Sequence, residues 1–156
     1  MAKWGGVRYV DFVMMTEDGG HPQPPTKKYP GDAGWDLFAS RPITIPPGDT
    51  MDVHTDIRMR MPERVFARII GRSSTLRTHR LLVSEAIIDN DYTGEMFISV
   101  HNIGSEPFEV ETGMRLAQVI FHMIEDIRWS EIEAYQFRPG RRGDRGFGST
   151  GMFKIE

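Results

Sequence analysis

Apolar and polar residues alternate along several short segments of this chain. In the segment 52–62, DVHTDIRMRMP, the apolar-side positions are Val53, Thr55, Ile57, Met59 and Met61, and the polar residues between them are His54, Asp56, Arg58 and Arg60. A period of two residues is typical of a strand with one buried face and one solvated face. The pattern therefore predicts a half-buried strand here, with Asp56 on the polar side.

Similar short segments occur along most of the chain, and turn residues such as Pro47-Gly48-Asp49 separate them. The predicted strands lie within residues 7–15, 41–48, 64–70, 81–88, 95–102, 107–113 and 115–124. Only residues 75–79 and 126–133 have room for a helical turn or two. Many short strands at this spacing predict an all-β sandwich, barrel or jelly roll.

Two segments do not fit the strand pattern. Residues 16–34 are rich in proline and glycine, which predicts a loop. Residues 141–151, RRGDRGFGSTG, combine glycines with arginines, which is typical either of a mobile terminus or of a loop that binds phosphate. Phe147 favours a segment that orders over a planar ligand, because an exposed ring has little use in a solvated linker.

Composition narrows the function classes. The 156 residues are 39% hydrophobic and 26% charged, which fits one globular domain, and the net charge of -3 argues against broad nucleic-acid binding. The absence of cysteine excludes disulfides, thiolate metal sites and cysteine nucleophiles. The sequence has neither a cleavable apolar leader nor a run of membrane-spanning length, so we expect no membrane association and an intracellular, cytoplasmic protein.

Polar residues cluster where an apolar strand ends in IIGRSS. Gly71 allows close backbone approach, Arg72 offers bidentate guanidinium geometry, and Ser73 and Ser74 offer hydroxyl donors. This chemistry suits an anion, although a short match of this kind also fits a solvated turn.

Three further polar residues stand next to apolar ones. Asp89 follows Ile87 and Ile88 in IIDNDYTGE, where a predicted hairpin would hold a carboxylate at the edge of a cleft; a simple turn aspartate is the alternative. Asp36 lies between Trp35 and Leu37, so it needs a partner such as a cation. Gln118, inside the run RLAQVIF, either pairs in the core or faces a ligand.

In chain order, the segments AGWDL, GRSS, IIDNDYTGE, GMRLAQ and RGDRGFGSTG resemble the five motifs of the homotrimeric dUTPase family, over residues 29–151. The resemblance implies a jelly-roll, or distorted β-barrel, subunit of a homotrimer. Residues 1–138 would form this domain, and residues 139–156 would form a flexible C-terminal arm that closes an active site built from all three chains. The implied reaction is Mg²⁺-dependent hydrolysis of dUTP to dUMP and pyrophosphate, which lowers dUTP and supplies dUMP for dTTP synthesis.

The resemblance also implies residue roles. Asp89 would activate the water that attacks the α-phosphorus, and Asp36 would hold Mg²⁺ through a coordinated water. The phosphates would be bound by Arg72, Ser73, Ser74, Gln118, Arg142, Gly148, Ser149 and Thr150, and Phe147 would stack over uracil. Main-chain groups around Val83, Ile87, Ile88 and Phe97 would read uracil, while Tyr92 would pack beneath the deoxyribose and exclude a ribose 2′-OH.

The chain departs from the family pattern at three positions. Gly71 replaces a common proline, Ala86 a common glycine of the uracil-binding segment, and Arg145 a common glycine of the arm; the segment 73–89 is also slightly short. None of these changes removes a predicted catalytic group. Two alternatives remain: a dCTP deaminase, whose glutamate-containing hairpin the motif IIDNDYTGE lacks, and a trimer of this fold that binds a regulatory protein partner, for which the loop 16–34 is the candidate surface.

Overall fold

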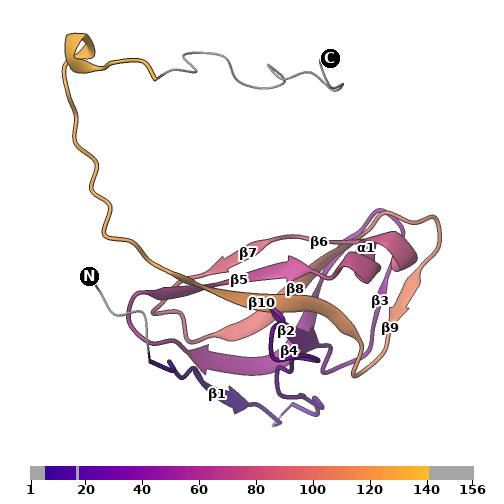
Figure 1. The fold of residues 1–156 in the computed structure, drawn as a ribbon. Helices are drawn as coiled ribbons and strands as arrows, with labels where there is room; N and C mark the ends of the chain where they lie inside the picture. The colour runs from indigo at the N-terminus through magenta and orange to yellow at the C-terminus, as the bar shows by residue number, and fades with distance from the viewer. Residues whose placement is uncertain (1–5, 17, 141–156) are drawn as a thin grey trace. The chain divides into compact units, whose positions relative to one another are not determined.

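The computed structural model describes residues 6–16 and 18–140, which belong to two compact units that meet in sequence between Glu125 and Asp126. The first unit contains two four-stranded antiparallel sheets and a two-stranded one (Figure 1). The first sheet has the order β1 (Asp11–Met14), β4 (Thr50–Arg60), β8 (Glu95–Asn102) and β6 (Leu81–Val83). The second has the order β2 (Trp35–Phe38), β10 (Arg115–Met123), β5 (Val65–Gly71) and β7 (Ala86–Ile88). The small sheet pairs β3 (Ile43–Ile45) with β9 (Phe108–Val110).

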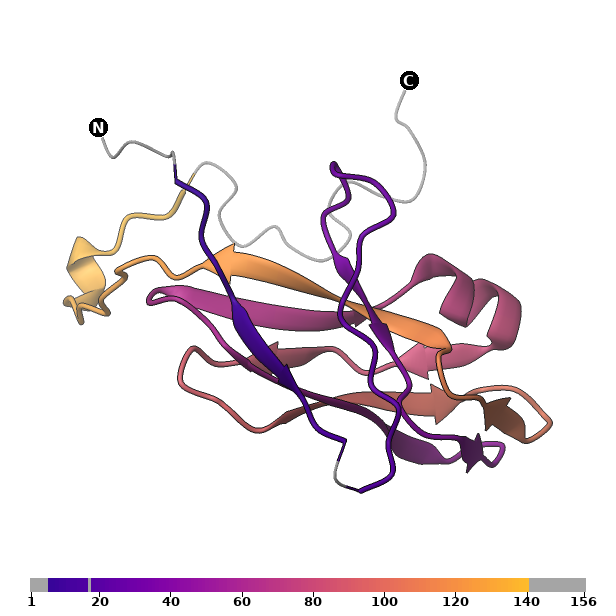
Figure 2. The ribbon, with the colours of Figure 1, turned by 90° about the horizontal axis from the view of Figure 1, so that it is seen from below.

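The core lies between the two large sheets, which face each other in Figure 2. In β5 and β8 buried residues alternate with more exposed ones, as a strand with one buried face requires. The largest fully buried apolar side chains include Leu37, Ile57, Ile69, Ile98 and Val119. Burying each such side chain contributes about 1.5–3 kcal/mol. The all-β prediction is confirmed.

The predicted strand over residues 81–88 is two strands. β6 pairs with β8 in the first sheet, whereas β7 pairs with β5 in the second. The chain crosses between the sheets at the exposed residues Ser84 and Glu85, where the Ser84 N–H donates to the carbonyl of Ser99 (2.9 Å). The prediction of a hairpin around Asp89 is also wrong, because the strands on its two sides, β7 and β8, belong to different sheets.

The strand over residues 52–62 is present as β4, but its alternation fails at Asp56. The pairing of β4 with β8 shifts between His54 and Arg58, and Asp56 has a positive φ of 53°. Because four residue steps on β4 oppose two on β8 here, Val53, Thr55, Ile57 and Met59 all keep their buried face, and only Asp56 departs from the alternation. Asp56 is therefore buried, at 1% exposure, instead of lying on the polar side of the strand.

Helical structure is scarce among the described residues. The turn expected at 75–79 is present as α1 (Ser73–His79), which ends at Arg80 with a φ of 57°. Residues 126–133 form no helix; a 3-10 turn follows them at Ala134–Gln136. Short helices depend on packing, and Trp129 in this segment is fully exposed. In the described part of the chain, no helix has the length and apolar character needed to cross a membrane.

Candidate active site

Five of the residues predicted from the sequence line a polar cavity of about 310 Å³: Asp36, Arg72, Ser73, Ser74 and Gln118. These residues come from β2, from the junction of β5 and α1, and from β10. The remaining lining comes from the end of the loop 16–34 and from β10: Thr26, Lys27, Lys28, Tyr29, Asp32, Ala33, Gly34 and Arg115. Segments far apart in sequence therefore meet in one polar site.

Sheet pairing explains this convergence. Asp36 on β2 is paired with Gln118 on β10, and Gln118 is paired with Ile70 near the end of β5. Arg72 follows β5 directly, and its N–H donates to the carbonyl of Leu116 (3.4 Å). The buried Thr75 hydroxyl donates to the same carbonyl (2.8 Å). The GRSS segment is thus fixed against β10 by its backbone and by Thr75.

Asp36 lies between two arginines. Its Oδ1 is 2.9 Å from Arg72 Nε, and its Oδ2 is 3.3 Å from Arg115 Nη1. Arg72 Nη1 also donates to the main-chain oxygen of Arg115 (3.2 Å). Each guanidinium has five N–H donors, so a single carboxylate leaves several of them available to a ligand.

The charge of the lining favours an anionic ligand. Lys27, Lys28, Arg72 and Arg115 supply four cations, whereas Asp32 and Asp36 are the two carboxylates. A concave surface of one net sign raises the local concentration of ligands with the opposite charge. Arginine additionally matches phosphate and carboxylate in bidentate geometry. A phosphate-bearing ligand fits this cavity.

Sequence reasoning missed Arg115, and the reason is a bulge. Arg115 and Gln118 are three residues apart, so a regular strand would direct them to opposite faces. The register of β10 against β2 shifts between Arg115 and Ala117. That shift brings Arg115 to the carboxylate of Asp36, the residue with which Gln118 is paired. The signal in the sequence was only the closeness of Arg115 to Gln118 in the segment GMRLAQ.

The end of the loop 16–34 has a defined shape at the cavity. The Tyr29 N–H donates to Asp32 Oδ2 (2.9 Å), and Lys27 donates to the carbonyl of Asp32. Gly34 is buried, and a Cβ at this position would lie 2.3 Å from Gln118 Oε1. Only glycine leaves this space for the glutamine side chain.

Of the predicted uracil-side residues, Val83 is buried against Gly71, whereas Ile87, Ile88 and Phe97 lie away from the cavity. Ile88 is paired with Ala67, and Arg72 lies five residues further along β5, or roughly 16 Å at ~3.3 Å per residue. Asp89 follows Ile88, is exposed, and does not line the cavity. Ile87 and Phe97 are exposed as well. A single chain therefore does not bring Asp89 together with the cavity residues.

The backbone around two family departures is regular. Gly71 has no positive φ, and a Cβ there would lie 3.2 Å from the Cβ of the buried Val83, so glycine lets Val83 pack closely against β5. Ala86 is paired with Ile69 in the second sheet. The residues predicted in the arm, Arg142, Phe147, Gly148, Ser149 and Thr150, and also Arg145, lie outside the described residues.

Tyr92 has a fixed position next to Asp89. Its N–H donates to the Asp89 carbonyl (3.1 Å), and its hydroxyl donates to the carbonyl of Glu95 (2.9 Å). Gly94 is required beneath the ring, because a Cβ there would lie 2.4 Å from the tyrosine hydroxyl. The neighbouring Asn90 side chain donates to the carbonyl of Pro62 (2.7 Å). The turn after β7 is therefore held on both sides.

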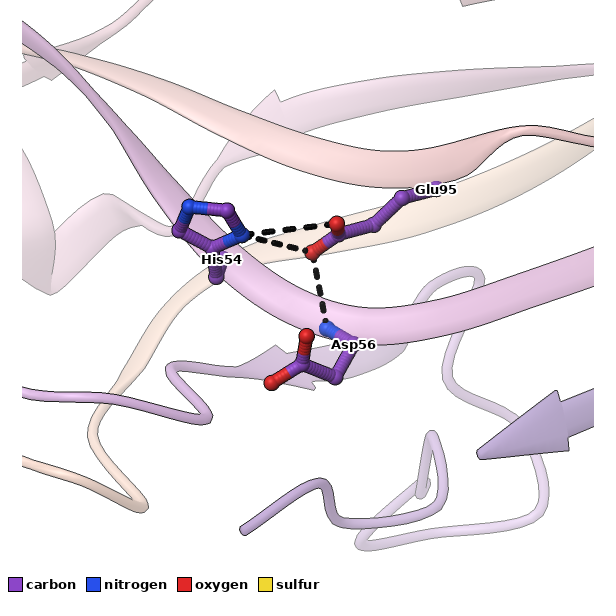
Figure 3. Close-up of side chains that lie close together, drawn as sticks. All are labelled: His54, Asp56 and Glu95. Carbon is purple, nitrogen blue, oxygen red and sulfur yellow. Dashed lines mark hydrogen bonds and ion pairs between the residues drawn. The ribbon is translucent and has the colours of Figure 1, made fainter. Parts of the chain in front are cut away.

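The side chains of His54, Asp56 and Glu95 form another cluster, which the sequence did not predict (Figure 3). Their potential metal-ligating atoms lie within 4.8 Å of one another. However, Arg41 donates to both Asp56 oxygens (2.6 and 3.0 Å), which lowers the pKa of the Asp56 carboxyl and raises that of Arg41. Glu95 accepts from the Asp56 N–H (3.0 Å) and contacts His54 Nδ1 (3.1 Å). These donors and acceptors are already engaged within the chain.

Comparison with known proteins agrees with this geometry. Residues 22–151 match the family model described as dUTPase. The deoxyuridine 5'-triphosphate nucleotidohydrolase of Vaccinia virus (strain Copenhagen) is 38% identical over 92% of this chain and 93% of its own length. The mitochondrial human protein of the same name is 37% identical over 96% of this chain and 57% of its own length.

Solved structures share the fold. A mutant dUTPase of Staphylococcus bacteriophage 80alpha with dUpNHpp has a TM-score of 0.84 and 19% identity, covering 94% of this chain and 100% of that one. A mutant dUTPase of phage phi11 of S. aureus, described with a structural Mg(II) ion, has a TM-score of 0.74 and 19% identity over 83% of this chain and 99% of that one. The expected jelly-roll class is confirmed by these likenesses. With the family model and the viral and human relatives together, the chain belongs to the dUTPase family.

Proposed function

We propose that this chain hydrolyses dUTP to dUMP and pyrophosphate, and that the cavity around Asp36 and Arg72 is the phosphate-binding part of its active site. The assignment of the reaction rests on membership of the dUTPase family. The observation that carries the assignment of the cavity is its excess of cations over carboxylates, with guanidinium donors left available. A triphosphate needs such a site, because its charge must be neutralised as pyrophosphate leaves.

Within the cavity, Arg72, Ser73, Ser74 and Gln118 would donate to phosphate oxygens. Arg115, which shares Asp36 with Arg72, joins this set. Because the backbone of the GRSS segment is fixed against β10 through Arg72 and Thr75 before any ligand arrives, this segment needs little rearrangement when charge develops.

The residues present are compatible with Mg²⁺. Asp36 is a single carboxylate in an open polar cavity, and magnesium commonly takes one or two carboxylates together with water and substrate phosphates. When bound, the ion would supply positive charge to the phosphates. Asp36 would hold it through a coordinated water, in exchange for part of its present contact with the arginines.

Asp89 would act from a different copy of the chain. It would orient a water for attack on the α-phosphorus and accept its proton, and pyrophosphate would leave as the new P–O bond forms. The spacing of roughly 16 Å along β5 is the reason to propose a shared site in a homotrimer. The copy of the chain that supplies Asp89 would also supply the segments that bind uracil, around Val83, Ile87, Ile88 and Phe97.

The arm, residues 139–156, would close the site from a further copy. There Phe147 would stack on uracil, and the phosphates would be contacted by Arg142, Gly148, Ser149 and Thr150. The cytoplasmic location expected from the sequence stays a prediction.

The primary test is pyrophosphate release from dUTP, dCTP, dTTP and UTP with Mg²⁺, with Asp89→Asn assayed beside the unmodified protein. We expect turnover of dUTP alone, lowered at least a hundredfold in the variant. A folded protein that releases pyrophosphate from none of the four nucleotides would contradict the proposed reaction.

The shared site has its own test. Asp89→Asn and Arg72→Met variants, each nearly inactive alone, would be dissociated, mixed and reassembled. Recovery of a substantial part of the activity is expected, since mixed trimers contain sites with both native residues. Failure to recover activity, with mixed trimers shown by mass spectrometry, would place both residues in one chain's site instead.

A further inference from the structure

A continuous set of hydrogen bonds connects the bulge of β4 to the ring of Tyr92. It begins at Asp56, passes through Glu95 at the start of β8, and ends at the tyrosine hydroxyl. Figure 3 shows its middle part, in which the Glu95 carboxylate lies between the His54 ring and the Asp56 backbone. None of these links was expected from the sequence.

The first link is rigid. Asp56 is held in its positive φ by two hydrogen bonds from Arg41, and its carboxylate is buried. The loop before β2 closes over it, because a Cβ on Gly20 would lie 1.8 Å from Asp56 Oδ2. The contacts with Arg41 and Gly20 therefore restrict the direction of the Asp56 N–H.

The second link is the Glu95 side chain, which is only 12% exposed. Its Oε1 accepts from the Asp56 N–H (3.0 Å) and lies 3.1 Å from His54 Nδ1. Because a carboxylate can only accept, the proton of that second bond is on Nδ1 of His54. With both contacts made, Glu95 cannot rotate without losing hydrogen bonds in a half-buried setting.

The third link is the main chain of Glu95, whose carbonyl accepts the Tyr92 hydroxyl (2.9 Å). Gly94 leaves room for that hydroxyl, and the exposed ring is held at its far end by this hydrogen bond. A ring that excludes a ribose 2′-OH by contact must not move aside when the larger sugar enters. Its selectivity depends on this restraint.

We propose that Glu95 is a positioning residue for sugar selection: its side chain fixes the carbonyl that holds Tyr92 in place. This inference rests on the proposed function, in which Tyr92 packs beneath the deoxyribose. Glu95 does not touch the substrate. It acts through Tyr92, so its loss changes the ratio between deoxyribose and ribose substrates more than it changes turnover of dUTP.

The test compares Glu95→Ala with Glu95→Gln, and Glu109→Ala serves as the control. Glu109 is exposed and accepts from Thr44 in the small sheet, outside the network. Values of kcat/KM would be measured for dUTP, UTP and dCTP. We expect Glu95→Ala to lower the dUTP/UTP ratio about tenfold, chiefly through a lower KM for UTP, with the dUTP/dCTP ratio unchanged. Glu95→Gln keeps an oxygen acceptor for the Asp56 N–H and is expected to retain most of the selectivity.

Tyr92→Phe provides a second readout that leaves Glu95 intact. Removing its hydroxyl breaks the same final link, so the dUTP/UTP ratio is expected to fall by a similar factor. An unchanged ratio in folded Glu95→Ala and Tyr92→Phe proteins would overturn the inference. So would an equal fall of the dUTP/dCTP and dUTP/UTP ratios, because that pattern indicates general loosening of the site.

Failure of the proposed function is distinguishable from failure of this inference. The unmodified protein would be titrated by calorimetry with dUpNHpp and with its ribose counterpart. If it binds neither and hydrolyses nothing, the proposed function and this inference fall together. If it discriminates the two sugars and the Glu95 and Tyr92 variants discriminate them equally well, the inference alone is wrong.

Discussion

Asp36 and Asp56 are both aspartates paired with arginine, yet their surroundings differ. The Asp56 side chain is 1% exposed, and both of its oxygens are taken by one guanidinium. The Asp36 side chain is 17% exposed and is shared by two guanidiniums that are themselves 28% and 47% exposed. In the Asp56 pair the carboxylate is buried although Arg41 is 30% exposed, whereas the Asp36 carboxylate opens into a cavity with a net positive lining.

The difference separates a structural ion pair from a binding site. The Asp56 carboxylate is buried and both of its oxygens are engaged, so this pair stabilises the conformation that contains it, here the β4 bulge. A solvent-accessible carboxylate between two arginines adds little to stability, because water screens it, but its arginines can exchange partners with a phosphate. We therefore expect disruption of the Asp36 cluster to lower activity with little change in stability, and disruption of the Asp56 pair to lower stability.

The largest expected effect concerns activity. Arg72→Met is expected to lower kcat/KM for dUTP about a thousandfold, or about 4 kcal/mol of transition-state stabilisation, while the free energy of unfolding changes by less than about 1 kcal/mol. Steady-state kinetics and urea unfolding measure the two quantities. Arg77→Met, at an exposed position of α1, is the control and should change neither. A large loss of stability in Arg72→Met would make the Asp36 cluster structural after all.

Two glycines provide a matched comparison of stability. Gly20→Ala places a Cβ 1.8 Å from Asp56 Oδ2, which cannot move, and is expected to cost about 3 kcal/mol. Gly34→Ala places a Cβ 2.3 Å from Gln118 Oε1, the end of a side chain that can rotate toward the cavity, and is expected to cost about 1 kcal/mol. Chemical unfolding measures both. Equal costs would mean that the two regions are equally rigid.

Direct removal of the charges is expected to have a smaller effect. Asp56→Asn should lower the free energy of unfolding by about 2 kcal/mol, since the half-buried Arg41 loses its partner but can partly rehydrate. Asp36→Asn should change it by less than about 0.5 kcal/mol. Thermal unfolding of the two variants in parallel checks this order, and the reverse order would contradict the distinction between the pairs.

The smallest expected effect is on pH dependence. The hydrogen bond from Arg41 lowers the pKa of Asp56 from its ordinary value of 3.8. The folded carboxyl therefore stays ionised at a pH where the unfolded one binds a proton, so its stabilisation is present above about pH 4 and is lost as pH falls through the folded pKa. The stability difference between the unmodified protein and Asp56→Asn should shrink by about 1 kcal/mol between pH 5 and pH 3. A constant difference would show that the charge of Asp56 does not contribute.

Much of the fold and part of the site followed from local patterns. Alternation over residues 52–62 predicted a half-buried strand, and short segments bounded by turn residues predicted the others, since each side chain's face is set by the pleat. The motif residues Asp36, Arg72, Ser73, Ser74 and Gln118, which the sequence predicts as site residues, all line one cavity. Such residues can be read from sequence because they are polar where a strand would otherwise be apolar.

Only the tertiary structure decided the rest. The switch of the chain between sheets at Ser84 and Glu85 depends on which strands pair, and pairing partners are set by contacts distant in sequence. The irregularity in β4 turned Asp56 inward, and a one-residue bulge in β10 brought Arg115 to Asp36; both depend on how the strand pairs with its neighbour. The sequence thus determined the fold class and several of the residues that line the polar cavity, while non-local pairing determined the bulges, the buried Asp56 and the separation of Asp89 from the cavity.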